Sequence, residues 1–387
     1  MKAMKGLIGA VALACAAASA QAETFKIGFM TTLTGPSAAL GQHLRDGFLL
    51  GIREMHDKLG AFDVEVVIAD DELKPDVAVT KIRALIERDR VDILGGIVFS
   101  NVMMAVYKPV RDANKIFVSG NAGPSPIAGA QCSENFFSVS WQNDGAHEAM
   151  GQYAKNKGFN RVVVMAPNYQ AGKDAIAGFK RFYGKEPLEE IYTQLNQLDF
   201  QADLARIASL SPDAIYTLMP GGMGVNLVKQ YSQAGLAGRI PFLSAFTVDE
   251  TTLPATQDAA LDLLAGAPWA PNIETPLNKR FVEAYEKAYG HPPSMYAAQG
   301  YDLARILDVA LKTSGGKKDT ASLRTAFKTL SFESVGGDFK LNRNGFPVRD
   351  FYLVKAAKRA DGKYVTQMVE KILDDHHDAY VKDCPLK

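Results

Sequence analysis

The chain has 387 residues and carries 43 lysines and arginines against 43 aspartates and glutamates, so its formal net charge at pH 7 is zero. A balanced charge argues against the basic surface typical of nucleic-acid-binding proteins and against a polybasic membrane-binding segment. The length is enough for two domains of ordinary size. We therefore expect a globular protein of two domains with no nucleic-acid partner.

Residues 1–22 have the pattern of a secretory signal peptide. Lys2 and Lys5 precede an apolar run that is too short to span a membrane, and the AQA sequence at 20–22 is a small-residue cleavage signature. An ordinary N-terminal helix and a lipoprotein site within the run (ALAC) are the alternatives. We expect cleavage before Glu23 and export of the mature chain.

The first part of the mature chain alternates short β-branched or apolar runs with helical patterns. Strands are predicted at 25–30, 64–70, 91–98 and 116–120, and the apolar residues of 76–89 recur at helical spacing. Alternating strands and helices are typical of βαβ units, in which helices cover both faces of a parallel sheet. The sequence therefore predicts an α/β domain.

After a predicted strand at 135–141 the alternation begins again, which indicates a second, similar α/β domain. The expected strands are 161–167, 188–194, 213–220 and 241–246, and the expected helices between them are 201–210 and 225–236. Two runs of similar length and spacing favour two similar domains over one large one.

From residue 268 onward the pattern changes to successive helices. They are predicted at 276–290, 299–315 and about 320–330, and strands follow at 350–356 and 363–372. Helices so late in the chain suggest that it crosses between the two lobes more than once, which would form a hinge and a cleft that closes on a ligand. The expected division is 23–141 plus 269–349 for the first lobe and 142–268 plus 350–387 for the second.

Two cysteines, Cys132 and Cys384, remain after the predicted cleavage. An even number in an exported protein favours a disulfide, because the compartment is oxidising. Two unrelated thiols are the alternative, and a metal pair is less favoured because no nearby histidine or cysteine completes a ligand set. We expect a bond that ties the end of the chain to its middle.

No catalytic constellation is found in the sequence. The phosphate-binding GxxxxGK[ST] pattern, the dinucleotide-binding GxGxxG pattern and the GxSxG nucleophile pattern are all missing. The DDHHD run at 374–378 is typical of a solvated tail more than of a metal site. We therefore expect no enzyme activity, no cofactor and no metal.

Small and polar residues follow six of the predicted strands, where open α/β sheets bind their ligands. These segments are 31–42, 99–104, 119–126, 166–172, 219–224 and 244–250. Ser100 or Asn101 could cap the helix that begins there. The free N–H groups at that helix start, together with the Ser100 hydroxyl, suit a ligand carboxylate.

Five segments of the chain resemble the periplasmic solute-binding proteins of ABC importers, in the branched-chain amino acid-binding group. They are KIGFMTTLTGPSAALGQHLRDGF (26–48), KPDVAVTKIRALIERDRVDILGG (74–96), IFVSGNAG (116–123), AIYTLMPGG (214–222) and QGYDLARIL (299–307). The resemblance implies the type I fold, two Rossmann-like lobes with parallel-type sheets joined by a hinge of three crossings. It also implies a periplasmic, monomeric protein that closes on one small ligand and docks on a membrane permease.

The resemblance assigns the carboxylate contacts residue by residue. Ser100 matches a serine that holds the ligand carboxylate at the start of a first-lobe helix. Asn121, Ala122 and Gly123 match the turn that supplies further contacts to the same group. Gly123 stands where the family usually has threonine, so one hydroxyl contact is missing here.

The residues expected near the ammonium end of an amino-acid ligand differ from those of the amino-acid binders. Phe246 stands at the position nearest to the acidic residue that pairs with the ligand ammonium, while Pro220 and Leu40 stand where those proteins have tyrosines. A buried ammonium without a carboxylate partner would carry a large desolvation cost. Asp249 and Glu250 lie three and four residues after Phe246. If the alignment with the family is shifted by that much, one of them takes the position of the acidic residue.

We therefore predict a small aromatic carboxylate as the ligand, of the benzoate, hydroxybenzoate, phenylacetate or cinnamate type, as in the aromatic-acid-binding branch of the family. Tyr169, His43 or Arg45 could bond a ring hydroxyl. The expected ligand-binding residues are Leu40, His43, Phe99, Ser100, Asn101, Asn121, Ala122, Gly123, Tyr169, Pro220, Gly221, Phe246 and Thr247. A binder of branched-chain or other aliphatic amino acids, or a ligand-sensing protein of the same fold, is the alternative.

Overall fold

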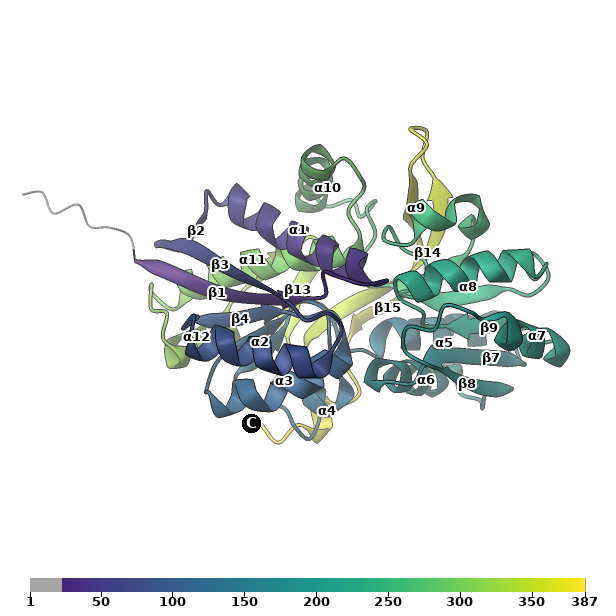
Figure 1. Ribbon diagram of the computed structural model, residues 1–387, viewed down its shortest axis with the longest axis horizontal. Coiled ribbons are helices and arrows are strands. Elements are labelled where there is room, and N and C mark those ends of the chain that lie inside the picture. Colours follow the sequence, from purple (N-terminus) through teal and green to yellow (C-terminus); the bar gives the residue numbers. More distant parts are fainter. Residues whose placement is uncertain (1–22, 387) are drawn as a thin grey trace, which may run out of the picture.

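The computed structural model describes residues 23–386, and two β-sheets lie side by side along its long axis (Figure 1). The predicted signal peptide, residues 1–22, lies outside the described residues. Within residues 23–386 no helix is both long and apolar enough to cross a membrane.

The first sheet has six strands and forms the first lobe with the helices around it. From one edge to the other they are β2 (Lys58–Leu59), β3 (Phe62–Asp70), β1 (Thr24–Thr31), β4 (Ile93–Gly96), β5 (Phe117–Ser119) and β6 (Phe136–Ser138). All neighbours are parallel except β2 and β3, which form a hairpin. The buried faces of β4, β5 and β6 explain why these strands read as unbroken apolar runs.

Helices cover both faces of this sheet (Figure 1). They are α1 (Ala38–Glu54), α2 (Pro75–Glu87), α3 (Ser100–Asp112), α4 (Ser125–Ala128), α10 (Pro276–Tyr289), α11 (Met295–Thr313) and α12 (Thr320–Thr329). The three helices predicted after residue 268 are thus confirmed, and α11 packs against α1. That contact is close because Gly47 and Gly300 have no side chain; a Cβ on either would collide with a backbone carbonyl of the facing helix.

The second sheet has nine strands and forms the second lobe except for β12 (Phe332–Ser334) and β13 (Gly337–Leu341), which lie beside α11 of the first lobe (Figure 1). Its order is β12, β13, β14 (Pro347–Lys358), β11 (Leu264–Ala267), β10 (Phe242–Ala245), β9 (Ala214–Thr217), β7 (Val162–Pro167) and β8 (Glu189–Thr193), with β15 (Tyr364–His376) paired to β14. The strands from β11 to β8 are parallel, as predicted, whereas β14 is antiparallel to β11.

The helices of the second lobe come from the middle of the chain. They are α5 (Gly145–Asn156), α6 (Gln170–Tyr183), α7 (Gln201–Leu210), α8 (Gly222–Gln233), α9 (Leu253–Thr256) and the short 3₁₀ helix η1 (Gln257–Ala260). A second 3₁₀ turn, η2 (Val381–Asp383), lies at the end of the chain. The predicted α/β class therefore holds for both lobes.

The chain passes between the lobes from β6 to α5, from β11 to α10, and again at the start of β14. Ser138 N, at the end of β6, donates to Gly345 O over 2.9 Å, just before β14 runs on to pair with β11. After β15 the chain returns to the first lobe, where Asn344 Nδ2 donates to both Ala128 O and Asp378. The lobe boundaries given above stay a prediction.

The structure contains the predicted disulfide between Cys132 and Cys384, whose Cα atoms are 5.6 Å apart. The bond closes a loop of 252 residues. In the loop-entropy account, a cross-link over so many residues removes much of the freedom of the unfolded chain.

We expect removal of this disulfide to lower the free energy of unfolding by about 2–4 kcal/mol. Urea denaturation of the unreduced protein, of the reduced protein and of the double variant Cys132→Ser/Cys384→Ser measures the effect. Reductant should leave the double variant unchanged, which controls for effects unrelated to the bond. Equal midpoints for the reduced and unreduced protein would contradict the prediction.

Candidate ligand-binding site

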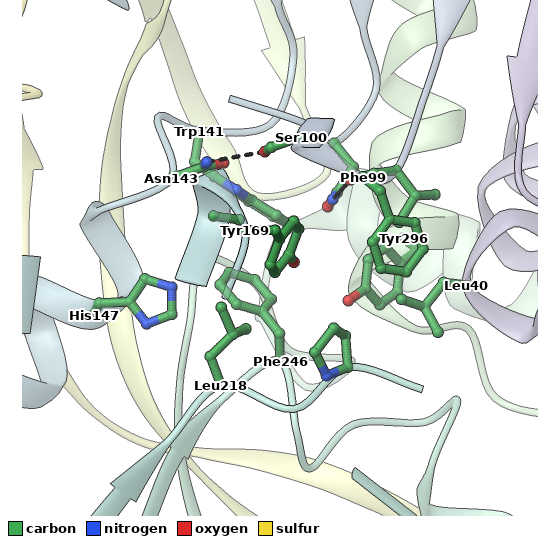
Figure 2. A pocket seen from close by; sticks show the side chains of 14 residues that line it. Leu40, Phe99, Ser100, Trp141, Asn143, His147, Tyr169, Leu218, Phe246 and Tyr296 are labelled. Carbon is green, nitrogen blue, oxygen red and sulfur yellow. Dashed lines mark hydrogen bonds between the residues drawn. The ribbon is translucent and has the colours of Figure 1, made fainter. Parts of the chain in front are cut away.

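A pocket lies where the carboxyl ends of the strands of both sheets meet (Figure 2). Its lining residues are Leu40, Val98, Phe99, Ser100, Asn121, Trp141, Asn143, His147, Tyr169, Ala171, Leu218, Pro220, Phe246 and Tyr296. The space between them is about 380 Å³, including the part open to solvent, and most of it is too narrow for a water molecule. The pocket is therefore narrow.

Seven of the predicted binding residues line this pocket: Leu40, Phe99, Ser100, Asn121, Tyr169, Pro220 and Phe246. The lining residues that the sequence did not single out are Val98, Trp141, Asn143, His147, Ala171, Leu218 and Tyr296. Trp141 ends a predicted strand and Asn143 lies two residues after it, so the rule that located the other loops applies to them too. No comparable signal marks Tyr296, which comes from the start of α11.

The remaining predicted residues do not line the pocket. Asn101 and Ala122 are next to lining residues in the chain, and Thr247 Oγ1 accepts a hydrogen bond from Met219 N over 2.8 Å. His43 lies elsewhere, with Nδ1 3.0 Å from Ser294 Oγ and its ring 4.7 Å from that of His291. Arg45, which the sequence offered for a ring hydroxyl, pairs with Asp46.

Ser100 is the first residue of α3, and its hydroxyl is buried in the pocket wall. The residue that precedes the helix is Phe99, in extended backbone, and no side chain caps the helix start. The predicted capping by Ser100 or Asn101 is therefore wrong. Ser100 Oγ instead accepts a hydrogen bond from Asn143 Nδ2 over 3.0 Å (Figure 2), and within residues 23–386 its own hydrogen has no acceptor.

The amide of Asn143 is fixed in orientation by its neighbours. Its Oδ1 accepts from Gly123 N over 2.9 Å, so its Nδ2 must be the atom that donates to Ser100 and, over 2.8 Å, to Asp174 Oδ2. Gly123 itself has no room for a side chain, because a Cβ there would collide with Trp141 O. This contact leaves no room for the threonine that the resemblance implies at this position.

Asp174 joins the two lobes beside the pocket. It belongs to α6, and its carboxylate accepts hydrogen bonds from both the backbone N (3.1 Å) and the hydroxyl (2.6 Å) of Ser125 in α4 of the first lobe. Gln170 Nε2 also donates to it, over 2.8 Å. Burial raises the pKa of Asp174 above its usual value, while the donors from Ser125, Asn143 and Gln170 oppose that shift.

A second contact between the lobes lies at the other rim of the pocket. Gly222 N, in the second lobe, donates over 3.1 Å to Pro36 O, which lies in the loop before α1 of the first lobe. A Cβ on Gly221 would lie 2.9 Å from Leu40 Cδ1, and one on Gly222 would lie 2.9 Å from Pro36 Cβ. The two glycines thus let the backbones of the lobes meet.

Six of the fourteen residues that line the pocket carry an aromatic ring. The Phe99 and Tyr169 rings lie 6.4 Å apart, and Trp141 packs against Phe246 with ring centroids 4.8 Å apart. Phe246 has a backbone φ of 56°, in the left-handed region that bulky residues rarely adopt. Such strain persists where the surrounding structure holds it, which is common at binding sites.

None of the residues that line the pocket is an acid, a lysine or an arginine, and burial lowers the pKa of His147 to about 3, so it is neutral. Asp249 and Glu250 do not line the pocket. Glu250 Oε1 accepts from Thr366 N and Oγ1, both over 2.7 Å, and Asp249 Oδ1 accepts from Thr251 N over 2.7 Å. A shift of the family alignment that puts Asp249 or Glu250 in place of Phe246 therefore brings no carboxylate into the pocket.

Comparisons with known proteins agree with this architecture. Residues 24–363 match the family model described as periplasmic binding protein. Over 365 residues the chain is 27% identical to Leu/Ile/Val-binding protein homolog 6 of Brucella melitensis, covering 92% of this chain and 93% of that protein.

Two solved structures of solute-binding proteins of ABC transporters from R. palustris are similar along almost the whole chain. One, in complex with benzoate, is 30% identical with a TM-score of 0.88, over 94% of this chain and 100% of that one. The other, in complex with 4-hydroxybenzoate, is 27% identical with a TM-score of 0.85, over 92% and 98%. The chain therefore belongs to the periplasmic binding proteins of type I, a family of non-catalytic solute-binding proteins that serve ABC transporters.

Proposed function

We propose that the protein captures a small aromatic carboxylate in the periplasm and delivers it to the membrane permease of an ABC importer. The ligand is an acid of the benzoate, hydroxybenzoate, phenylacetate or cinnamate type. The observation that carries the proposal is a narrow pocket that has six aromatic residues and no charged side chain in its lining. A flat ring fits such a space, and each ring that it touches adds apolar contact area.

The start of α3 supports the carboxylate end of the ligand. Ser100 Oγ accepts from Asn143, and its own hydrogen has no acceptor within residues 23–386, so the hydroxyl can donate to a ligand. The N–H groups of the first helical turn have no partners within the helix. Hydroxyl and backbone donors at a helix N-terminus stabilise an anion without a positively charged side chain.

Closure of the lobes supports capture over catalysis. Asp174 with Ser125, and Gly222 with Pro36, join the lobes on two sides of the pocket. A ligand that contacts both lobes binds the closed form better than the open one, and this difference in affinity drives closure. The protein then acts as a monomer that presents its closed form to the permease.

A binder of branched-chain amino acids is the second candidate, and the names of the Brucella relatives favour it. An amino acid would bring an ammonium into a pocket that lacks a carboxylate partner. The nearby acid Asp174 already accepts from Asn143, Ser125 and Gln170. The uncompensated desolvation of the ammonium disfavours this candidate.

A thermal-shift screen of the mature protein tests the proposal. Benzoate, 4-hydroxybenzoate, phenylacetate and cinnamate are compared with leucine, isoleucine and valine at equal concentrations. At one hundred times its Kd, a ligand stabilises the folded state by about 2.7 kcal/mol, so a true ligand raises Tm by several degrees. If only the aliphatic amino acids stabilise the protein, the proposal that its ligand is an aromatic acid is rejected.

A further inference from the structure

One wall of the pocket contains a polar atom that the carboxylate contact does not use. His147 lies in the first turn of α5, is 1% exposed and lines the pocket. Its Nδ1 is hydrogen-bonded to the Tyr216 hydroxyl, whereas its Nε2 makes no hydrogen bond within residues 23–386. A polar atom in a pocket wall that has no hydrogen-bond partner in the protein is available to a group of the ligand.

The imidazole of His147 is held in place by two neighbours, Tyr216 and Phe246. Besides the bond to Tyr216, its ring meets that of Phe246 edge to face at 5.4 Å between centroids. Tyr216 is in turn stacked on Phe179 at 4.2 Å. Figure 2 shows His147 beside Phe246, on the side of the pocket opposite Leu40. The unpaired nitrogen is therefore a fixed feature of the pocket and not the end of a mobile side chain.

The chemistry of a neutral imidazole limits what can pair with Nε2. If the Tyr216 hydroxyl donates to Nδ1, then Nε2 carries the hydrogen and is a donor; if Nδ1 donates to Tyr216, then Nε2 is an acceptor. A hydroxyl group satisfies Nε2 in either case, because it both donates and accepts. An alkyl or halogen substituent would leave the nitrogen unpaired.

We propose that His147 recognises a hydroxyl group on the ring of the ligand, so that the ligand is a hydroxylated aromatic acid and not an unsubstituted one. The inference rests on the proposed function and names the chemical class within it. The ligand carboxylate is held at Ser100, and the ring hydroxyl is held by Nε2 of His147, which lines the pocket beside Phe246. His147 is thus the residue that selects the ring substituent.

Isothermal titration calorimetry of the wild-type protein with matched acids provides the first test. The probes are benzoate, 3- and 4-hydroxybenzoate, and 3- and 4-methylbenzoate, in which a methyl group replaces the hydroxyl at similar size. At least one hydroxybenzoate should bind about tenfold tighter than its methyl counterpart, the effect of one buried hydrogen bond. Equal affinities within both pairs would overturn the inference without any variant.

Two variants then locate the effect. His147→Phe should weaken the binding of the hydroxybenzoate more than that of its methyl counterpart, so that the tenfold preference is lost. His147→Gln, which keeps a polar group near the position of Nε2, should restore part of the preference. Unchanged preference in His147→Phe would overturn the inference, and so would a matching loss of benzoate binding, which would put the carboxylate at His147. If the wild-type protein binds none of these benzoates but binds phenylacetate or cinnamate, the inference fails and the proposed function stands. If it binds no aromatic acid at all, the proposed function fails as well.

Discussion

Replacing Ser100 with alanine should weaken benzoate binding about 10- to 100-fold, because a hydrogen bond to a charged group contributes about 1.5–3 kcal/mol. The Ser100 hydroxyl has one role inside the protein, as an acceptor from Asn143. Asn143 keeps its bonds to Gly123 and Asp174 when that acceptor is lost. The unliganded protein should therefore lose little stability. Calorimetric titration gives the affinity and thermal melting gives the stability.

The matched control is Asn101→Ala. Asn101 is the next residue of α3, is half-buried and does not line the pocket, so this variant should bind benzoate within about twofold of the wild type. If Ser100→Ala binds benzoate as the wild type does, the carboxylate is not held at the start of α3. An equal loss in both variants would indicate damage to the helix.

Replacing Asp174 with asparagine should weaken ligand binding at least tenfold through the closure of the lobes. The carboxylate accepts two hydrogen bonds from Ser125 and one each from Asn143 and Gln170. An asparagine offers a single oxygen and turns an NH₂ group toward these donors. The contact with the first lobe is lost, and the closed form becomes less populated.

Small-angle scattering with increasing benzoate measures this closure. The radius of gyration of Asp174→Asn should shrink only at higher benzoate concentrations than in the wild type, in step with its weaker calorimetric affinity. Asp203→Asn is the control, because the Asp203 carboxylate bonds only to Gln197 within the second lobe. Unaltered affinity in Asp174→Asn would show that this bridge does not contribute to closure.

Much of the fold could be predicted because each α/β unit is local in sequence. The apolar runs of β1, β4 and β7, and the helical spacing of α2 and α10, each depend on neighbouring residues only. The antiparallel pairing of β14 with β11 could not be read in this way. It joins segments about ninety residues apart and depends on where the chain crosses between the lobes.

The binding residues, too, could be predicted where the signal is local in sequence and could not where it depends on distant residues. Ser100 and Phe246 follow strands directly, so the rule that ligands bind at strand ends, together with the family resemblance, located them. The Asn143–Asp174 contact and the His147–Tyr216 contact join residues 31 and 69 positions apart. A lone asparagine or histidine in a helix start gives no signal of such a partner. His43, in contrast, was selected for its place in the sequence, and its side chain lies with Ser294 and not in the pocket.

The covalent link between Cys132 and Cys384 also decides how the protein can be made into a sensor. Thr24 is in the central strand of the first lobe, and the disulfide holds Cys384 to that same lobe. Two fluorophores fused at the chain ends would therefore move together and report nothing when ligand binds. A useful pair needs one dye on the second lobe, for example at Gln194, an exposed residue in the turn after β8. Reduction of the disulfide would then free the terminal dye and change the signal without any ligand.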